Sequence, residues 1–127
     1  MANLVWTEDG LDWLKDRAFN PSTTAAAALA IAIGSGSTAP DPTDTALVAE
    51  TARGALTYTA VGVGTFKVSR TFAAGVGTGT VAEVGLFDNT TASTGTLLAR
   101  ALVSSFTKAA GDSYTVELPI DLTDVLA

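Results

Sequence analysis

The chain has 127 residues, 47% of them hydrophobic, which is the length of one domain with enough apolar side chains for a packed core. It contains no cysteine and no histidine, which excludes disulfides, thiolate sites and imidazole catalysis. The net charge is −6 and the seven basic residues are scattered, so nucleic acid and anionic membranes are not expected partners. The acidic excess suits either a high-salt environment or a protein whose copies repel one another.

No segment has the pattern of a membrane span or a secretion signal. The longest apolar run, residues 25–33, is far shorter than the roughly 20 residues that a spanning helix needs. The start, Met1-Ala2-Asn3, lacks basic residues, and acidic residues closely follow Trp6. We therefore expect neither membrane insertion nor export through a cleaved signal.

The first third of the chain predicts a helix, a strand and a second, short helix. Thr7 can cap a helix over residues 7–19, whose first turns are acidic and whose later turns carry cations. Residues 25–33 alternate Leu and Ile with Ala, which indicates a strand with one bulky and one small face. Prolines and glycines make 34–45 a loop. Asp41 or Asp44 can then cap a short helix over 45–51.

From residue 55 onward the pattern is β. Strands are predicted at 56–61, 65–72, 81–87, 96–103 and 113–122, separated by the glycine-rich turn 75–79, the polar turn 88–95 and the connection 106–112. In the third of these strands, Val84 and Leu86 point one way and Val81, Glu83 and Phe87 the other. Pro119 indicates an edge strand or a strand end.

These elements predict one domain over residues 1–127, mainly β, with an N-terminal helical segment at about 7–19. We expect an antiparallel β-sandwich of about six strands with an N-terminal helix and one short helix.

Three short motifs invite a chemical interpretation. Ser105 and Lys108 match the S-x-x-K pattern of serine acyl-transfer enzymes, but that pattern needs a helix and here falls between strand-like runs. The glycines of 75–79 lack the spacing of a phosphate loop, so a hairpin turn is favoured. Asp41 and Asp44 lack the calcium-loop pattern, and helix capping is the better explanation.

Other polar residues have a structural interpretation beside a functional one. Asn89 begins an N-x-T glycosylation acceptor, although turns favour asparagine in any case. Arg70 falls on an apolar strand face, which predicts a position near a strand end or a carboxylate partner. A buried Glu83 would pair with Arg70 or Arg100 as a structural ion pair rather than a catalytic acid.

Two tryptophans lie close to the N-terminal helix. Trp6 and Trp13 either cover the open end of the sandwich or dock on another subunit, because tryptophan is enriched at the centres of interfaces. They are the candidate assembly-interface residues. We expect no catalytic, cofactor-binding or metal-binding residues.

Several short sequence motifs follow one another in a characteristic order from residue 30 onward. They are IGSGSTAP at 33–40, TDTALVAETAR at 43–53, EVGLFD at 83–88, LLAR at 97–100 and KAAGDSYTV at 108–116. Together they resemble a diffuse family of small structural proteins of tailed bacterial or archaeal viruses, described as tail-fibre or capsid-decoration proteins. The resemblance covers roughly three quarters of the chain.

The resemblance implies a non-enzymatic virion protein: a symmetric surface oligomer of the head, as a decoration or turret, or of the tail or baseplate. The expected partners are copies of itself in a ring and the major capsid or tail proteins of the particle, with contact to a host surface as a further hypothesis. The expected location is the virion, assembled in the host cytoplasm. Two alternatives stay open: a cell-surface carbohydrate- or protein-binding β-sandwich module, and a hydrolase using Ser105 and Lys108.

Overall fold

A computed structural model describes residues 4–22 and 28–123. The described residues form one helix and eight strands, where the sequence predicts about six strands. In chain order they are β1 (Val5–Trp6), α1 (Glu8–Phe19), β2 (Ala30–Gly34), β3 (Glu50–Ala55), β4 (Thr57–Gly62), β5 (Thr65–Phe72), β6 (Gly79–Phe87), β7 (Leu97–Lys108) and β8 (Tyr114–Asp121).

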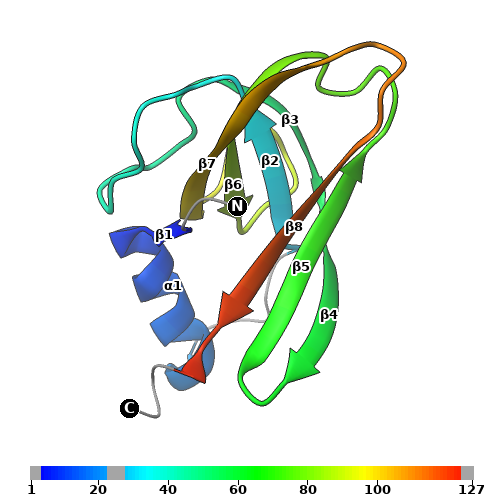
Figure 1. The fold of residues 1–127 in the computed structure, drawn as a ribbon. Helices are drawn as coiled ribbons and strands as arrows, with labels where there is room; N and C mark the ends of the chain where they lie inside the picture. The colour runs from blue at the N-terminus through cyan, green and yellow to red at the C-terminus, as the bar shows by residue number, and fades with distance from the viewer. Residues whose placement is uncertain (1–3, 23–27, 124–127) are drawn as a thin grey trace.

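The strands form two antiparallel sheets, which confirms the predicted mainly-β sandwich (Figure 1). One sheet has five strands in the order β1-β7-β6-β2-β3, and the other has three in the order β4-β5-β8. The main core lies between them. Its buried aliphatic and aromatic members include Ile31, Ile33, Val84, Leu86, Val68, Phe72, Val116 and Leu118.

Helix α1 begins where the sequence predicts. Thr7 caps it by accepting a hydrogen bond from the Gly10 N–H at 2.9 Å, with Glu8 and Asp9 in the first turn. The helix packs on β7 through Gly10, where an added Cβ would lie 2.1 Å from the Leu98 carbonyl oxygen. A glycine is therefore needed at this close approach.

Strand β2 lies between β6 and β3, and all five of its residues are buried. It is shorter than the predicted strand at 25–33, of which residues 25–27 lie outside the described part. Its small face is confirmed, since Ala32 belongs to a second cluster with Leu47, Phe87 and Leu97 on the face turned away from the main core.

The predicted short helix at 45–51 is wrong. Residues 45–49 are irregular and β3 begins at Glu50. The N–H groups of Val48 and Ala49 donate to the Glu83 carboxylate, at 3.1 and 2.8 Å, instead of to carbonyls one turn back. Asp41 and Asp44 consequently do not cap a helix here.

Strands β3 and β4 belong to different sheets although Leu56 alone separates them. The Leu56 N–H donates to the Leu29 carbonyl at 3.1 Å, which fixes the corner. Arg70 on β5 reaches across to this corner and donates to the Ala55 carbonyl at 3.3 Å. Arg70 lies two residues before the end of β5, which agrees with the predicted position near a strand end, and no described carboxylate pairs with it.

The glycine-rich turn does not close a hairpin, contrary to prediction. It carries the chain from β5 in one sheet to β6 in the other, and Gly75, Gly77 and Gly79 all have positive φ. Gly77 also has little space, because an added Cβ would lie 2.7 Å from the Ile33 Cδ1.

Strands β6 and β7, on either side of the polar turn 88–95, pair as an antiparallel hairpin with two register shifts. One shift lies between Val81 and Glu83, and it turns Val81 into the main core. The expectation that Val81 shares a face with Glu83 is therefore wrong, because a bulge breaks strict alternation.

Strand β7 continues to Lys108, past the predicted end at residue 103. The Lys108 side chain is buried, and its Nζ donates to the carbonyls of Ala73 at 2.9 Å and Asp112 at 2.6 Å. One ammonium group thus holds together two of the connections that cross between the sheets, those from β5 to β6 and from β7 to β8. Pro119 lies on β8, at an edge of its sheet as predicted.

Candidate functional site

A long irregular connection, residues 35–49, covers the outer face of the five-stranded sheet, and we call it the strap. The outer face is the one turned away from the three-stranded sheet. Leu47 anchors the strap by packing with Ala32, Phe87 and Leu97. The Glu8 N–H also donates to the Pro42 carbonyl, which joins the strap to α1. The polar residues beneath and beside the strap form the candidate site.

Glu83 lies at the centre of these contacts, and its side chain is fully buried. Its carboxylate accepts the N–H groups of Gly36, Val48 and Ala49, at 3.2, 3.1 and 2.8 Å. It also accepts two bonds from Arg100, at 2.9 and 2.7 Å. Burial raises the pKa of Glu83, but the bonds from Ala49, Arg100 and Val48 outweigh burial and hold the pKa below its usual range.

Arg100 connects Glu83 to the strap. Its side chain is 1% exposed, and Nη1 donates to Asp44 Oδ2 at 3.2 Å. The same Asp44 oxygen accepts the Asp41 N–H at 2.9 Å. The predicted structural ion pair of Glu83 is confirmed, with Arg100 as its partner.

A second ion pair lies on β3. The Arg53 side chain is 1% exposed and donates twice to Glu50, at 2.9 and 2.7 Å. Its Nη1 donates to the carbonyls of Asn89 at 3.0 Å and Thr94 at 2.7 Å. Its guanidinium carbon lies 3.5 Å from the centre of the Phe87 ring, a close cation–π contact.

The strand register places the two arginines in one row across the outer face. Arg53 pairs with Ala32, Ala32 with Gly85, and Gly85 with Arg100. The two central positions are small, and Leu47 fills the space above them: a Cβ on Gly85 would lie 2.7 Å from the Leu47 Cδ2. The site thus consists of charged side chains around one apolar anchor, Leu47. We call the charged set, Asp44, Glu50, Arg53, Glu83 and Arg100, the frame.

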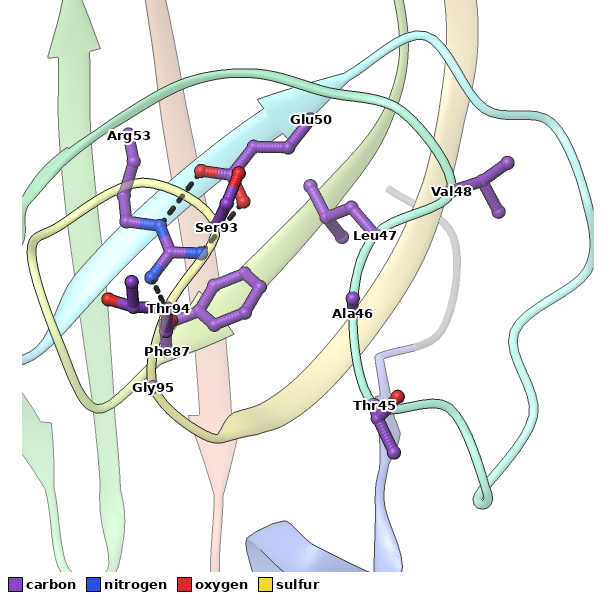
Figure 2. A pocket seen from close by; sticks show the side chains of 10 residues that line it. All are labelled: Thr45, Ala46, Leu47, Val48, Glu50, Arg53, Phe87, Ser93, Thr94 and Gly95. Atoms are coloured by element: carbon purple, nitrogen blue, oxygen red, sulfur yellow. Dashed lines mark hydrogen bonds and ion pairs between the residues drawn. The ribbon is translucent and has the colours of Figure 1, made fainter.

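A hollow of about 270 Å³ opens between the strap and the polar turn 88–95. Figure 2 shows the Arg53 guanidinium and the Phe87 ring on one side and the strap on the other. Its lining residues are Thr45, Ala46, Leu47, Val48, Glu50, Arg53, Phe87, Ser93, Thr94 and Gly95. Sequence reasoning did not find this hollow, since its walls come from three separate segments.

The chemistry of the frame is that of holding a segment in place. A carboxylate has about four lone-pair sites, and Glu83 accepts five hydrogen bonds. Arg53 donates from all three of its nitrogens. Glu83 thus fixes the strap in one position, and Arg53 fixes the polar turn 88–95 against β3.

The structure does not bring Ser105 and Lys108 together as a nucleophile and base. Both lie on β7, with Ser105 in the irregular stretch between Leu102 and Phe106 and Lys108 at the end of the strand. Ser105 is exposed, whereas the Lys108 nitrogen is bonded to two carbonyls. The helix that the S-x-x-K pattern requires is replaced by a strand.

The remaining sequence candidates make local turn contacts. Asp41 accepts the Thr43 hydroxyl and N–H, which lower its pKa. Asn89 accepts the Thr91 N–H at 2.7 Å, the turn geometry that asparagine favours. Within residues 4–22 and 28–123, no three acidic side chains gather as a metal site would require.

Trp6 and Trp13 are both half-buried and pack against the main core. Trp6 lies in β1 opposite Ala99 of β7, and Trp13 lies on α1 with the Arg17 guanidinium over its ring. This packing agrees with the alternative in which the two tryptophans cover the sandwich. Their role in an assembly interface stays a prediction.

A scan against models of protein families finds no match for this chain, and a search of curated proteins finds no significant relative. In the part of the chain that the structure describes, no helix has both the length and the apolar character for crossing a bilayer.

Proposed function

We propose that this chain is a non-enzymatic structural protein of a tailed-virus particle, an oligomeric surface component of the head or of the tail. The observation that carries the proposal is the position, in the structure, of the sequence motifs shared with such proteins. Those motifs include two residues of the strap and six residues of the sheet face beneath and beside it: Asp44 and Leu47, and Glu50, Arg53, Glu83, Gly85, Phe87 and Arg100.

The contacts within the frame give a physical reason for these motifs to occur in one chain. Glu83, Arg100 and Arg53 each bond to another segment of the same chain, and the small members make room for Leu47. Buried ion pairs specify one arrangement of the chain rather than adding much net stability. A rigid domain of this kind suits a building block that must present the same surface in every copy.

The internal use of the charged groups also favours assembly over catalysis. The side chains of Glu83 and Arg53 are buried and bonded inside the chain, and Lys108 holds two turns. The buried charged groups therefore stabilise the fold of the chain itself. Its exposed surface is left for contact with copies of itself and with other particle proteins.

Native mass spectrometry of the purified chain tests this proposal, followed by location of the subunit on intact particles by cryo-electron microscopy. We expect a discrete symmetric oligomer, with five copies indicating a capsid vertex and three or six fitting a capsid lattice or the tail. A chain that stays monomeric at micromolar concentration and is missing from purified particles would overturn it.

A second candidate function is a carbohydrate- or protein-binding module of a cell surface. The hollow beside Arg53 favours it, because the hydroxyl groups of Thr45, Ser93 and Thr94 lie at its walls. A glycan array with the monomeric chain tests this function. Binding that Ser93→Ala and Thr94→Ala abolish would support it over the virion proposal.

A further inference from the structure

The most exposed apolar surface of the described chain lies on the β4–β5 hairpin. Tyr58, Val61 and Val63 are 63%, 68% and 86% exposed, and every residue of β4 is exposed. Figure 1 shows this hairpin extending away from the five-stranded sheet. Large exposed apolar groups gathered in one place indicate a contact surface.

The exposure of Tyr58 is unusual for its position in the sheet. Tyr58 pairs with Val68, and Val68 pairs with Leu118, so the three side chains share the face that forms the core. Val68 and Leu118 are buried, whereas Tyr58 contacts the Phe66 ring at 5.5 Å and is otherwise open. The five-stranded sheet therefore covers the core-facing sides of β5 and β8 but leaves that of β4 exposed at Tyr58.

The backbone edge of β4 is also open, because no described strand pairs with its outer side. The other sheet edges carry features that discourage pairing. Strand β1 has two residues, β3 carries Glu50 and Arg53, β8 carries Pro119 between Glu117 and Asp121, and a bulge distorts β7 between Leu102 and Phe106. The irregularity of β4 falls at its end, after Ala60.

Charge indicates which partner fits this edge. The chain carries a net charge of −6, so its copies repel one another over most of their surfaces. Between Arg53 and Lys67, however, there are thirteen consecutive residues with no charged side chain. An antiparallel pairing of β4 with its own copy places these uncharged segments against each other about a two-fold axis.

We propose that β4 is a self-association edge, which pairs antiparallel with β4 of a second copy. The pairing joins two three-stranded sheets into one of six strands and brings the exposed Tyr58 side chains toward the two-fold axis. The inference rests on the proposed assembly into several copies. A two-fold contact closes a dimer by itself, so it joins subunits in pairs and fits oligomers with an even number of copies.

Matched charge variants on the two edges of the same sheet test the inference. Thr59→Glu places a carboxylate on β4 across from Lys67, and Thr115→Glu places one on β8. Both positions are exposed on the outer face of the three-stranded sheet, and both changes add one negative charge. Sedimentation velocity over a concentration series measures self-association, and circular dichroism establishes that each variant is folded.

We expect Thr59→Glu to weaken association at least about tenfold, because like charges meet across the axis, and Thr115→Glu to leave it unchanged. Hydrogen exchange of the wild-type chain should show β4 amides that gain protection as concentration rises. Should Thr59→Glu fail to fold, Val63→Thr at the hairpin tip provides the second test. It leaves the backbone edge intact and removes an exposed apolar group, so it should also weaken self-association in sedimentation velocity.

Association that Thr59→Glu and Thr115→Glu weaken equally, or β4 amides whose protection is independent of concentration, would overturn the β4 edge. Oligomers that persist unchanged in Thr59→Glu would do the same while leaving the virion proposal standing. A wild-type chain that never associates would overturn the β4 edge, and it would overturn the virion proposal as well if the chain is also missing from purified particles. Concentration-dependent protection without a defined dimer mass would indicate open-ended self-association and would contradict the closed two-fold pairing.

Discussion

The outer face of the five-stranded sheet and the open edge of the three-stranded sheet differ in almost every respect. The first is covered by the strap, and its charged groups are buried and bonded inside the chain. The second has no charged residue over thirteen positions and exposes Tyr58, Val61 and Val63. The comparison teaches that polarity alone does not mark a binding surface here, because the polar region is internal and the apolar one is outside.

Removal of Arg100 is the largest expected break in this comparison. Arg100→Ala leaves the Glu83 carboxylate buried without its cation, which should cost about 3–5 kcal/mol of unfolding free energy. Lys67→Ala removes the exposed pair with Glu117 and should cost about 0–1 kcal/mol. Urea unfolding followed by tryptophan fluorescence measures both, and equal losses would contradict the central place of the frame.

A methyl group under the strap should have the next largest effect. In Gly34→Ala the new Cβ would lie 2.5 Å from the Ala49 carbonyl oxygen, so the backbone of the strap must move. We expect a loss of about 1–3 kcal/mol. Gly111→Ala is the matched control, because nothing lies within 4 Å of its Cβ position, and it should change stability by less than about 0.5 kcal/mol.

Acid should loosen the frame through Glu83. Its folded-state pKa lies below the usual value of 4.5, so its contribution to stability is complete above pH 4.5 and is lost as pH falls through the folded pKa. Unfolding free energies measured from neutral to acidic pH should therefore fall more steeply for the wild-type chain than for Glu83→Gln. Parallel curves would show that the strap does not depend on this ionised group.

Changes at the β4 edge should affect folding least. Val63→Thr and Tyr58→Thr replace exposed side chains, so the stability of the monomer should stay within about 0.5 kcal/mol. Thermal unfolding at low concentration measures this. A large loss of monomer stability would mean that the hairpin serves the fold rather than a partner.

Sequence reasoning predicts local patterns well in this chain. The strand at 65–72 is confirmed at both ends, and Val116, Leu118 and Ile120 share the buried face of β8 as alternation predicts. The Thr7 cap is also confirmed, since capping depends on residues a few positions apart.

The errors arise where distant residues decide the structure. Glu83 captures the N–H groups of Val48 and Ala49 from 35 and 34 positions away, which replaces the predicted short helix with the strap. Strand β3 was not predicted, because Glu50 and Arg53 interrupt its apolar pattern. Most residues of the candidate site lie in the motifs that carry the resemblance, but only the ion pair of Glu83 was predicted as a contact. The cation–π contact of Arg53 with Phe87 left no signal in the spacing.

The Lys108 clamp has a mechanical consequence for the sandwich. Its ammonium group fastens the connection after β5 to the connection after β7, so the two layers are pinned at one end. The tip of the β4–β5 hairpin lies far from this pin (Figure 1). Local unfolding on heating should therefore start at the hairpin tip and spread toward Lys108. A partner bound to β4 would stabilise the part of the sandwich that is farthest from the Lys108 contacts.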